Sequence, residues 1–187
     1  MIIGLHGSKR SGKDTAYEFI KSEYNHAIRL AFADKIKESL AALFGVSIRE
    51  INTLKEERGV FKIESASFEH SYTWRSFAQR FGTEAHRDIF GENFWVDLIL
   101  PQSDLLGVKK HKDELWVITD VRFQNEALRI KELDGYVIEI DRPELKYNDL
   151  HISEERLPND LIYCTISNDG SLEQFKERML EVVSKLI

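Results

Sequence analysis

Short apolar runs alternate along the chain with segments whose apolar residues recur every three or four positions. The runs are rich in Ile, Val and Leu, and we expect five of them to form buried strands, at residues 1–5, 27–32, 115–119, 136–140 and 161–166. Strands that are separated by helices are joined by right-handed crossovers into a mainly parallel sheet with helices on both faces. The pattern therefore predicts an α/β fold whose ligands bind at the carboxyl ends of the strands.

The segments with helical spacing predict the elements between these strands. We expect helices at residues 13–23, 34–44, 73–81, 84–90, 93–100, 124–133 and 172–186. Gly45 follows one of them as a C-cap, and Ser47 with Glu50 and Ser171 with Gln174 form capping boxes. Residues 55–72 are polar and charged, and we assign no element to them.

The segment Gly7–Thr15, which reads GSKRSGKDT, joins the first strand to the first helix and matches the pattern G-x-x-x-x-G-K. Glycines let successive backbone N–H groups turn toward phosphate oxygens, and the following helix adds its positive N-terminal end. Lys13 then reaches the outer phosphates of a nucleoside triphosphate. We therefore expect ATP to bind at Gly7, Ser11, Gly12, Lys13, Asp14 and Thr15.

The loop departs from the strict motif directly after Lys13. Asp14 stands where a Ser or Thr hydroxyl ordinarily binds Mg²⁺, and Thr15 follows it. Asp14 could hold a Mg²⁺-bound water or favour the helix N-terminus electrostatically. Thr15 could supply the metal-side hydroxyl or cap backbone N–H groups, and the sequence leaves both pairs of alternatives open.

A second group of candidates follows the strand at residues 115–119. Asp120 ends this strand, where its carboxylate could bind a Mg²⁺ water, orient the substrate or cap the turn. We favour a functional role, because a phosphate loop is already present for it to serve. Arg122 would stand at the same sheet edge as Lys13, where its planar fork suits bidentate phosphate binding, although a solvated charge at a helix start is the alternative.

The segment from 73 to 87 is dense in arginine and is a candidate site for a second phosphorylated substrate. Arg80 and Arg87 are seven residues apart, but Gly82 intervenes, so the pattern does not assure one shared face. A solvated helix face explains the charges equally well. Gln79 and Trp95 could contact a base or pack in the core, and for Trp95 we favour packing.

Residues 141–160 form a long charged segment between two predicted strands, which is typical of a lid that closes over a site. It contains Arg142, His151 and Arg156. Phosphoryl transfer to a phosphate oxygen needs little proton abstraction, so we expect His151 to donate or accept a hydrogen bond rather than act as a base.

Composition narrows the range of partners. The chain has 187 residues, enough for one domain, and a formal net charge of −6, which argues against a long nucleic-acid partner but not against a small phosphorylated ligand. No apolar run is long enough to span a membrane.

Cys164 is the only cysteine, and we interpret it as a buried structural thiol. The N-terminus lacks the pattern of a secretory signal. These features favour a cytoplasmic protein.

The ordered blocks of this sequence resemble the deoxynucleoside monophosphate kinases of tailed bacteriophages. The resemblance rests on blocks that span nearly the whole chain: Gly7–Thr15, the segment ADKIK at 33–37, QRFGTE at 79–84 with Arg87, Trp95 with Val96, DVRFQNE at 120–126, His151 with Ser153 and Glu154, and SNDGS at 167–171. Of the individual blocks, only the phosphate loop is specific. The whole set in this order is much more specific than any single block.

The resemblance implies a P-loop three-layer sandwich with a five-stranded parallel sheet, a monophosphate-binding region at 45–100 and a lid at 141–160, in a single domain. It implies transfer of the ATP γ-phosphoryl group to a deoxynucleoside monophosphate with Mg²⁺, in the host cytoplasm if the chain is phage-encoded. The roles it implies are ATP and metal binding by Gly7, Gly12, Lys13, Asp14 and Thr15; monophosphate or phosphoryl binding by Lys37, Arg80, Arg87 and Arg122; base contacts by Gln79 and Trp95; an adenine contact by Asn168; and lid roles for Arg142 and Arg156.

Two rival readings stay open. Dephospho-coenzyme A kinases and phosphomevalonate kinases use similar loops and lids with another acceptor. A nucleotide-binding switch would bind triphosphate and turn it over slowly without a partner, although the arginine-rich middle and the long charged segment favour a kinase. The sequence leaves the accepted bases and the oligomeric state open, a homodimer included.

Overall fold

The computed structural model describes residues 1–56, 60–64, 69–101, 114–143 and 156–187. The chain divides into two compact units, which we describe separately: unit 1 comprises Met1–Phe32 and Ile99–Ile187, and unit 2 comprises Ala33–Leu98. The acceptor-binding region expected at 45–100 falls almost wholly in unit 2. Most of the lid-like segment expected at 141–160, His151 included, lies outside the described residues.

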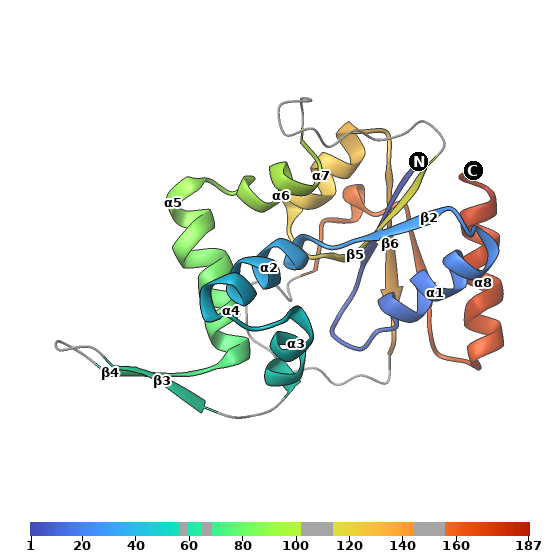
Figure 1. Cartoon of the computed structure of the whole chain (residues 1–187). Helices are drawn as coiled ribbons and strands as arrows, with labels where there is room; N and C mark the ends of the chain where they lie inside the picture. Colours follow the sequence, from blue (N-terminus) through green and yellow to red (C-terminus); the bar gives the residue numbers. More distant parts are fainter. Residues whose placement is uncertain (57–59, 65–68, 102–113, 144–155) are drawn as a thin grey trace. The chain divides into compact units, whose positions relative to one another are not determined.

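Unit 1 is built on a five-stranded sheet (Figure 1), and its strand order is β2-β5-β1-β6-β7. Every neighbouring pair is parallel. The strands are β1 (Ile2–His6), β2 (Ala27–Leu30), β5 (Leu115–Val121), β6 (Tyr136–Asp141) and β7 (Cys164–Ser167). The chain places successive strands first on one side of β1 and then on the other, so a switch point lies at β1, where ligands of such sheets bind.

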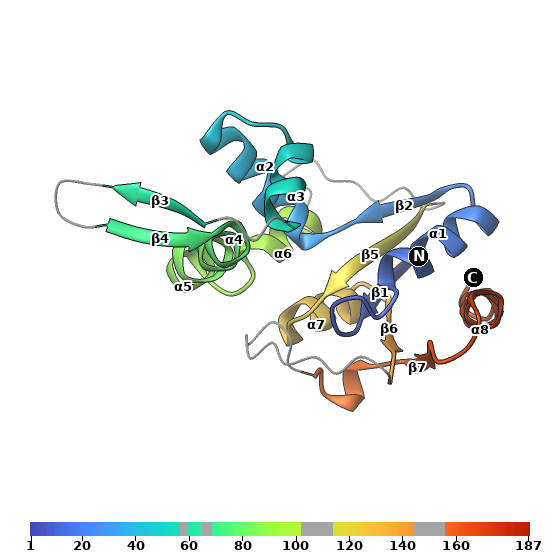
Figure 2. The same cartoon turned by 90° about the horizontal axis from the view of Figure 1, so that it is seen from below.

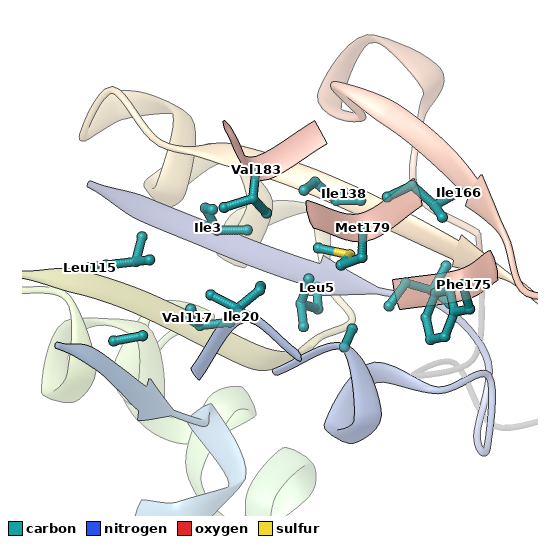
Figure 3. Packing of buried hydrophobic residues seen from close by; sticks show 13 residues of the cluster. Ile3, Leu5, Ile20, Leu115, Val117, Ile138, Ile166, Phe175, Met179 and Val183 are labelled. Atoms are coloured by element: carbon teal, nitrogen blue, oxygen red, sulfur yellow. The ribbon is translucent and has the colours of Figure 1, made fainter. Parts of the chain in front are cut away.

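Helices cover both faces of this sheet, which confirms the predicted α/β fold. α1 (Lys13–Glu23) and α8 (Leu172–Ser184) lie on one face, and α7 (Gln124–Glu132) lies on the other (Figure 2). Ile3 and Leu5 point toward the first pair of helices and pack with Ile20 and Met179 (Figure 3). On the opposite face a Cβ on Gly4 would lie 2.6 Å from Ile130 Cδ1, so glycine lets α7 pack directly against β1.

Unit 2 is mainly helical and has a small core of its own. Leu40, Ala41 and Ile51 are buried in it, and Trp74 and Phe77 pack against them. The elements are α2 (Phe32–Phe44), which begins at the last residue of unit 1, α3 (Ile48–Glu56), the antiparallel pair β3 (Val60–Glu64) and β4 (Glu69–Thr73), α4 (Trp74–Gly82), the π-helical turn η1 (Thr83–Arg87), α5 (Asp88–Phe90) and α6 (Phe94–Ile99).

Several predicted boundaries are confirmed. Ser47 N donates to Glu50 Oε2 at 2.8 Å and Glu50 N to Ser47 Oγ at 3.2 Å, and Ser171 and Gln174 form the same box before α8. Gly45 has a φ of +65°, as expected of a C-cap glycine. Within the described residues, no helix combines the length and the apolar character needed to span a bilayer.

Other predictions are wrong in ways that tertiary contacts explain. The strand expected at 161–166 begins only at Cys164, because Asn159–Leu161 forms the 3₁₀ helix η4 and buries Leu161 there. The strand expected at 27–32 ends at Leu30, and the next helix starts at Phe32. Residues 60–64 and 69–72, to which no element was assigned, lie in the antiparallel strands β3 and β4, and Thr73 ends β4 rather than beginning the next helix. Cys164 is half-buried rather than buried, and burial raises the pKa of its thiol, which disfavours a reactive thiolate.

Candidate functional site

The phosphate loop leaves the carboxyl end of β1 and enters α1 through two glycines with positive φ. Gly7 has a φ of +140°, and a Cβ there would lie 2.4 Å from the Ile140 carbonyl oxygen. Gly12 has a φ of +113°, and its Cβ would lie 2.7 Å from Asn168 Nδ2. Both positions combine left-handed backbone with a close approach of other atoms, so only glycine fits them. The glycine spacing of the motif is therefore imposed by this turn.

Lys13 is folded back into the loop. Its Nζ donates to the carbonyl oxygens of Gly7 and Ser8, at 2.7 Å each, and the residue is buried, with 9% of its surface exposed. A cation that neighbouring backbone carbonyls hold at the mouth of a glycine loop is placed where phosphate oxygens would compete for it. The phosphate-binding role of Lys13 itself stays a prediction.

Two residues brace the loop from within. Ser11 is fully buried and its N–H donates to the Ser8 carbonyl at 3.1 Å, so it forms the turn. Asn168, in the connection between β7 and α8, donates from Nδ2 to the Ser11 carbonyl at 2.8 Å. The backbone N–H of Asn168 in turn donates to the Asp141 carbonyl at 2.7 Å. The expected adenine contact of Asn168 is not tested by these bonds, but they give it a clear role in holding the loop.

Asp14 and Thr15 occupy the first turn of α1, where the positive end of the helix favours an anion. Asp14 is exposed and Thr15 is half-buried. Neither side chain makes a hydrogen bond to another described residue, so the capping alternative for Thr15 has no support here. Both groups lie directly after the loop, within reach of a ligand that the loop would hold.

Asp120 lies at an irregularity of the sheet. Gly4 pairs with Ile118 but His6 pairs with Val121, so two residues of β5 lie opposite Leu5, as in a β-bulge. Bulges of this kind re-aim side chains and are common beside active sites. Asp120 Oδ1 accepts a hydrogen bond from Phe32 N, the first residue of α2, at 2.8 Å. The carboxylate therefore caps a helix, which adds a structural role to the functional roles predicted for it.

Arg122 follows the same strand and stands at the start of α7. Its N–H donates to Glu126 Oε2 at 2.7 Å, and the N–H of Phe123 donates to the same oxygen at 3.0 Å. Glu126 is buried and thus caps α7 and fixes the backbone that carries Arg122. The guanidinium lies close enough to His6 to disfavour a positive charge there, as Lys13 does. The structure thus brings Arg122 and Lys13 to the same carboxyl edge of the sheet, as expected.

His6 is a residue of this edge that the sequence did not single out. It is the last residue of β1, is 6% exposed, and its Nδ1 lies 3.0 Å from the Val121 carbonyl oxygen. Because a carbonyl only accepts, Nδ1 carries the hydrogen. Burial lowers the pKa of His6 below its usual 6.5, which outweighs the opposing effect of the Val121 bond. The imidazole of His6 is therefore uncharged at neutral pH, which suits a position near the cations of Lys13 and Arg122.

We expect this histidine to make stability depend on pH. A lowered pKa in the folded state means that the unfolded chain binds a proton below pH 6.5 that folded His6 resists, so stability is lost as the pH falls. Between about pH 7 and about pH 5.5 the Tm of the wild-type protein should fall more steeply than that of His6→Asn. Asn keeps a donor near the position of Nδ1 but does not titrate. Parallel Tm profiles would contradict this role.

Glu139 faces His6 across the β1–β6 pair, on the same side of the sheet. It accepts two bonds from Arg156, from Nε at 3.0 Å and Nη2 at 2.9 Å, and one from Thr165 Oγ1 at 2.8 Å. Burial works to raise the pKa of Glu139, but these bonds outweigh it and lower the pKa. Arg156 was expected to be a lid residue; here its guanidinium is paired at the sheet. Arg142 follows β6 and is exposed.

The other predicted residues lie in unit 2. Lys37 Nζ donates to Asp34 Oδ1 at 3.2 Å, one turn earlier in α2. Arg80 is 59% exposed and pairs with Glu84 at 2.7 Å. Gln79 and Arg87 are half-buried. Trp95 is 5% exposed and its Nε1 donates to the Gly82 carbonyl at 2.8 Å, so it lies in the core, which is the packing alternative.

Comparison with known proteins agrees with this geometry. The family model of deoxynucleotide monophosphate kinases matches residues 1–62 and 46–179. A protein of Acanthamoeba polyphaga mimivirus is 33% identical over 98% of this chain and 96% of its own length. The deoxynucleotide monophosphate kinase of Enterobacteria phage T4 is 28% identical over 99% of both chains. The deoxynucleoside-5'-monophosphate kinase of Escherichia phage T5 is 27% identical over 90% of this chain and 89% of its own.

Solved structures support the fold. The dephospho-CoA kinase from Campylobacter jejuni superimposes with a TM-score of 0.52 at 18% identity, covering 99% of this chain and 96% of that chain. Identity at this level shows a common fold and nothing about the acceptor. The family match, in contrast, spans the phosphate loop, the arginine-rich helices and the turn before α8. The chain therefore belongs to the deoxynucleotide monophosphate kinase family.

Proposed function

We propose that this chain transfers the γ-phosphoryl group of ATP to a deoxynucleoside monophosphate, giving ADP and a deoxynucleoside diphosphate. The observation that carries the proposal is the loop Gly7–Thr15, with Lys13 held over its carbonyls, in a chain that belongs to this kinase family. A glycine loop with a buried lysine binds the phosphates of a triphosphate, and the family membership supplies the acceptor class.

Such a reaction depends on positioning and on charge neutralisation, because two anionic nucleotides must meet in line. In unit 1 the donor side would comprise Gly7, Ser11, Gly12, Lys13, Asp14, Thr15, Arg142 and Asn168. Lys13 leaves the carbonyls of Gly7 and Ser8 for the phosphate oxygens of ATP, while Asn168 keeps the loop in shape. Arg122 neutralises charge that develops on the equatorial oxygens of the moving group.

The residues present at this edge fit a magnesium ion. Mg²⁺ is usually held by one or two carboxylates together with substrate phosphates and waters. The side chains of Asp14 and Thr15 make no hydrogen bond to another described residue, and Asp120 lies near the end of β5, the strand beside β1. Among the described residues no three His, Cys, Asp or Glu side chains gather into a group that could hold a metal ion by themselves. When bound, Mg²⁺ would neutralise phosphate charge.

The acceptor would be held by residues of unit 2 that the family resemblance assigns. Lys37 and Arg87 would bind the monophosphate, and Gln79 would contact the base. The similar roles that the resemblance assigns to Arg80 and Trp95 stay predictions; Arg80 pairs with Glu84, and Trp95 is buried in the core. His151 stays a prediction, because it lies outside the described residues.

Asp120 allows its capping and its functional role to be separated. Asp120→Asn keeps an oxygen that accepts from Phe32 N but removes the negative charge. We expect the free energy of unfolding to stay within about 0.5 kcal/mol of the wild-type value, while kcat falls by at least about tenfold. Asp120→Ala should reduce kcat and also cost about 1 kcal/mol of stability, as loss of a cap does. An Asn variant with full turnover would leave Asp120 with the capping role alone.

The proposal is tested by measuring ADP formation from ATP and Mg²⁺ across a panel of acceptors. The panel contains the four common deoxynucleoside monophosphates, the corresponding ribonucleotides, dephospho-coenzyme A and phosphomevalonate. We expect turnover with one or more deoxynucleotides, which would also define the accepted bases. If ADP formed only with dephospho-coenzyme A or phosphomevalonate, that compound and not a deoxynucleotide would be the acceptor. Slow turnover that does not depend on any acceptor would favour a nucleotide-binding switch.

A further inference from the structure

The helical segment that carries Gln79, Arg80 and Arg87 contains a π-helical turn, which the sequence did not predict. We propose that this turn, η1, moves Arg87 away from Arg80 and onto the face that carries Arg75 and Gln79. The acceptor monophosphate is then bound by Arg75, Gln79 and Arg87, and His86 is the positioning residue that holds the turn. This inference rests on the proposed function and deepens it.

The geometry of an α-helix determines which of these side chains share a face. In an uninterrupted α-helix each residue advances about 100°, so residues seven apart, such as Arg80 and Arg87, lie within about 20° of one face. Gly82 does not interrupt the helix, because its φ of −71° and ψ of −38° are helical. The turn Thr83–Arg87, however, contains an extra residue, so every later side chain is set back by about 100°. Arg87 then lies two regular turns from Gln79 instead of Arg80.

The position of the His86 side chain shows that the side chains after Gly82 are rotated in this way. Its ring lies among the aromatic side chains of unit 2, with ring centroids 4.3 Å from Phe81 and 4.9 Å from Trp95. Without the extra residue His86 would be turned about 100° away from Phe81 and its neighbours. Because His86 points inward, Arg87 follows about 100° further round, on the side of Gln79. Arg75 precedes Gln79 by one turn and shares that side.

The exposure of the side chains agrees with this arrangement. Arg75, Gln79 and Arg87 are all half-buried, whereas Arg80 is 59% exposed. The contacts of Arg80 lie on its own side of the helix: its Nε donates to Glu84 Oε2 at 2.7 Å, and its guanidinium carbon lies 5.8 Å from the centre of the Tyr72 ring. Arg80 therefore belongs to another face of α4.

Side chains satisfy the backbone where the α-helix passes into the π turn. His86 Nδ1 donates to the Phe81 carbonyl at 2.6 Å, and Trp95 Nε1 donates to the Gly82 carbonyl at 2.8 Å. Directly after the turn, Asp88 N donates to the Thr83 carbonyl, which is the five-residue spacing of a π-helix. Gly82 permits the close packing of this junction, since a Cβ there would lie 2.7 Å from Ile36 Cδ1. His86 is the one of these donors that lies within the turn itself.

The test compares two substitutions of His86. His86→Phe keeps an aromatic ring in the cluster but removes the donor to Phe81 O. His86→Asn keeps a donor near the position of Nδ1. We expect His86→Phe to raise KM for the deoxynucleoside monophosphate by about tenfold while KM for ATP stays near the wild-type value, and His86→Asn to restore much of the loss. A general loss of structure would change KM for the acceptor and KM for ATP alike. A change in KM for the acceptor alone therefore indicates a positioning role rather than a folding defect.

Arginine variants test the proposed face in the same assay. Arg75→Gln and Arg87→Gln should each raise KM for the acceptor by at least about tenfold, whereas Arg80→Gln should change it by less than about twofold. An effect of Arg80→Gln equal to that of Arg87→Gln would overturn the proposed face. If KM for the acceptor were unchanged in His86→Phe but raised in Arg87→Gln, the positioning role of His86 would be overturned. If the wild-type protein phosphorylated no deoxynucleotide, the proposed function itself would be contradicted.

Discussion

Lys13→Ala is expected to lower kcat by at least about 100-fold while the protein stays folded. Lys13 is a buried cation at the mouth of the phosphate loop, and its Nζ is held by two carbonyl oxygens that it would exchange for phosphate oxygens. Its loss removes a preorganised positive charge from the reacting phosphates. The measurement is steady-state turnover with saturating ATP and deoxynucleotide, together with the Tm.

Lys185→Ala is the matched control for this substitution. Lys185 is an exposed lysine near the end of the chain that pairs with Glu181, far in sequence from the loop. We expect its removal to leave kcat within about twofold of the wild-type value, as for an exposed ion pair. Near-normal turnover in Lys13→Ala would contradict the assignment of the loop, and an equal loss in both variants would indicate a nonspecific effect of charge.

Gly7→Ala is expected to damage both stability and ATP binding. The residue has a φ of +140°, and its new Cβ would lie 2.4 Å from the Ile140 carbonyl oxygen, a backbone atom that cannot rotate away. Strain and overlap together should cost at least about 2 kcal/mol of unfolding free energy. Because the loop must shift to relieve the overlap, KM for ATP should rise by at least about tenfold. Denaturant titration and steady-state kinetics measure the two effects.

Gly45→Ala separates backbone strain from overlap. Gly45 also has a positive φ, +65°, but a Cβ there would meet no atom within 4 Å. We expect this variant to lose about 1 kcal/mol, the cost of a left-handed residue, with no change in KM for ATP. If Gly7→Ala were no more destabilising than Gly45→Ala, the close approach of β6 to the loop would not constrain the phosphate site.

Elements with local signals were predictable from the sequence. Ser47 with Glu50 and Ser171 with Gln174 marked helix starts because a capping box is formed by neighbours in the chain. The phosphate loop was recognisable for the same reason, since its glycines, its lysine and the helix after it are contiguous. The central strands were predictable because burial on both faces of a parallel sheet makes each strand a short apolar run.

Features that depend on distant contacts were not predictable. Gly82 looked like a helix end, but it is a helical residue that lets α4 pack near Ile36. The partnership of His6 with Val121 and Glu139 depends on strand register, which no local pattern encodes. The π turn that separates Arg80 from Arg87 depends on donors from His86 and Trp95. In the part of the chain that the structure describes, β3 and β4 pair only with each other, and so small a sheet leaves only a weak alternating pattern in the sequence.

The most direct test of the central claim follows the phosphoryl group itself. The protein is incubated with Mg²⁺, a deoxynucleoside monophosphate that supports turnover and ATP labelled in its γ-phosphoryl group, and the products are separated. We expect the label to appear in the deoxynucleoside diphosphate in an amount equal to the ADP formed. Label found only in inorganic phosphate would show that ATP is hydrolysed rather than used for transfer, and would contradict the assignment as a monophosphate kinase.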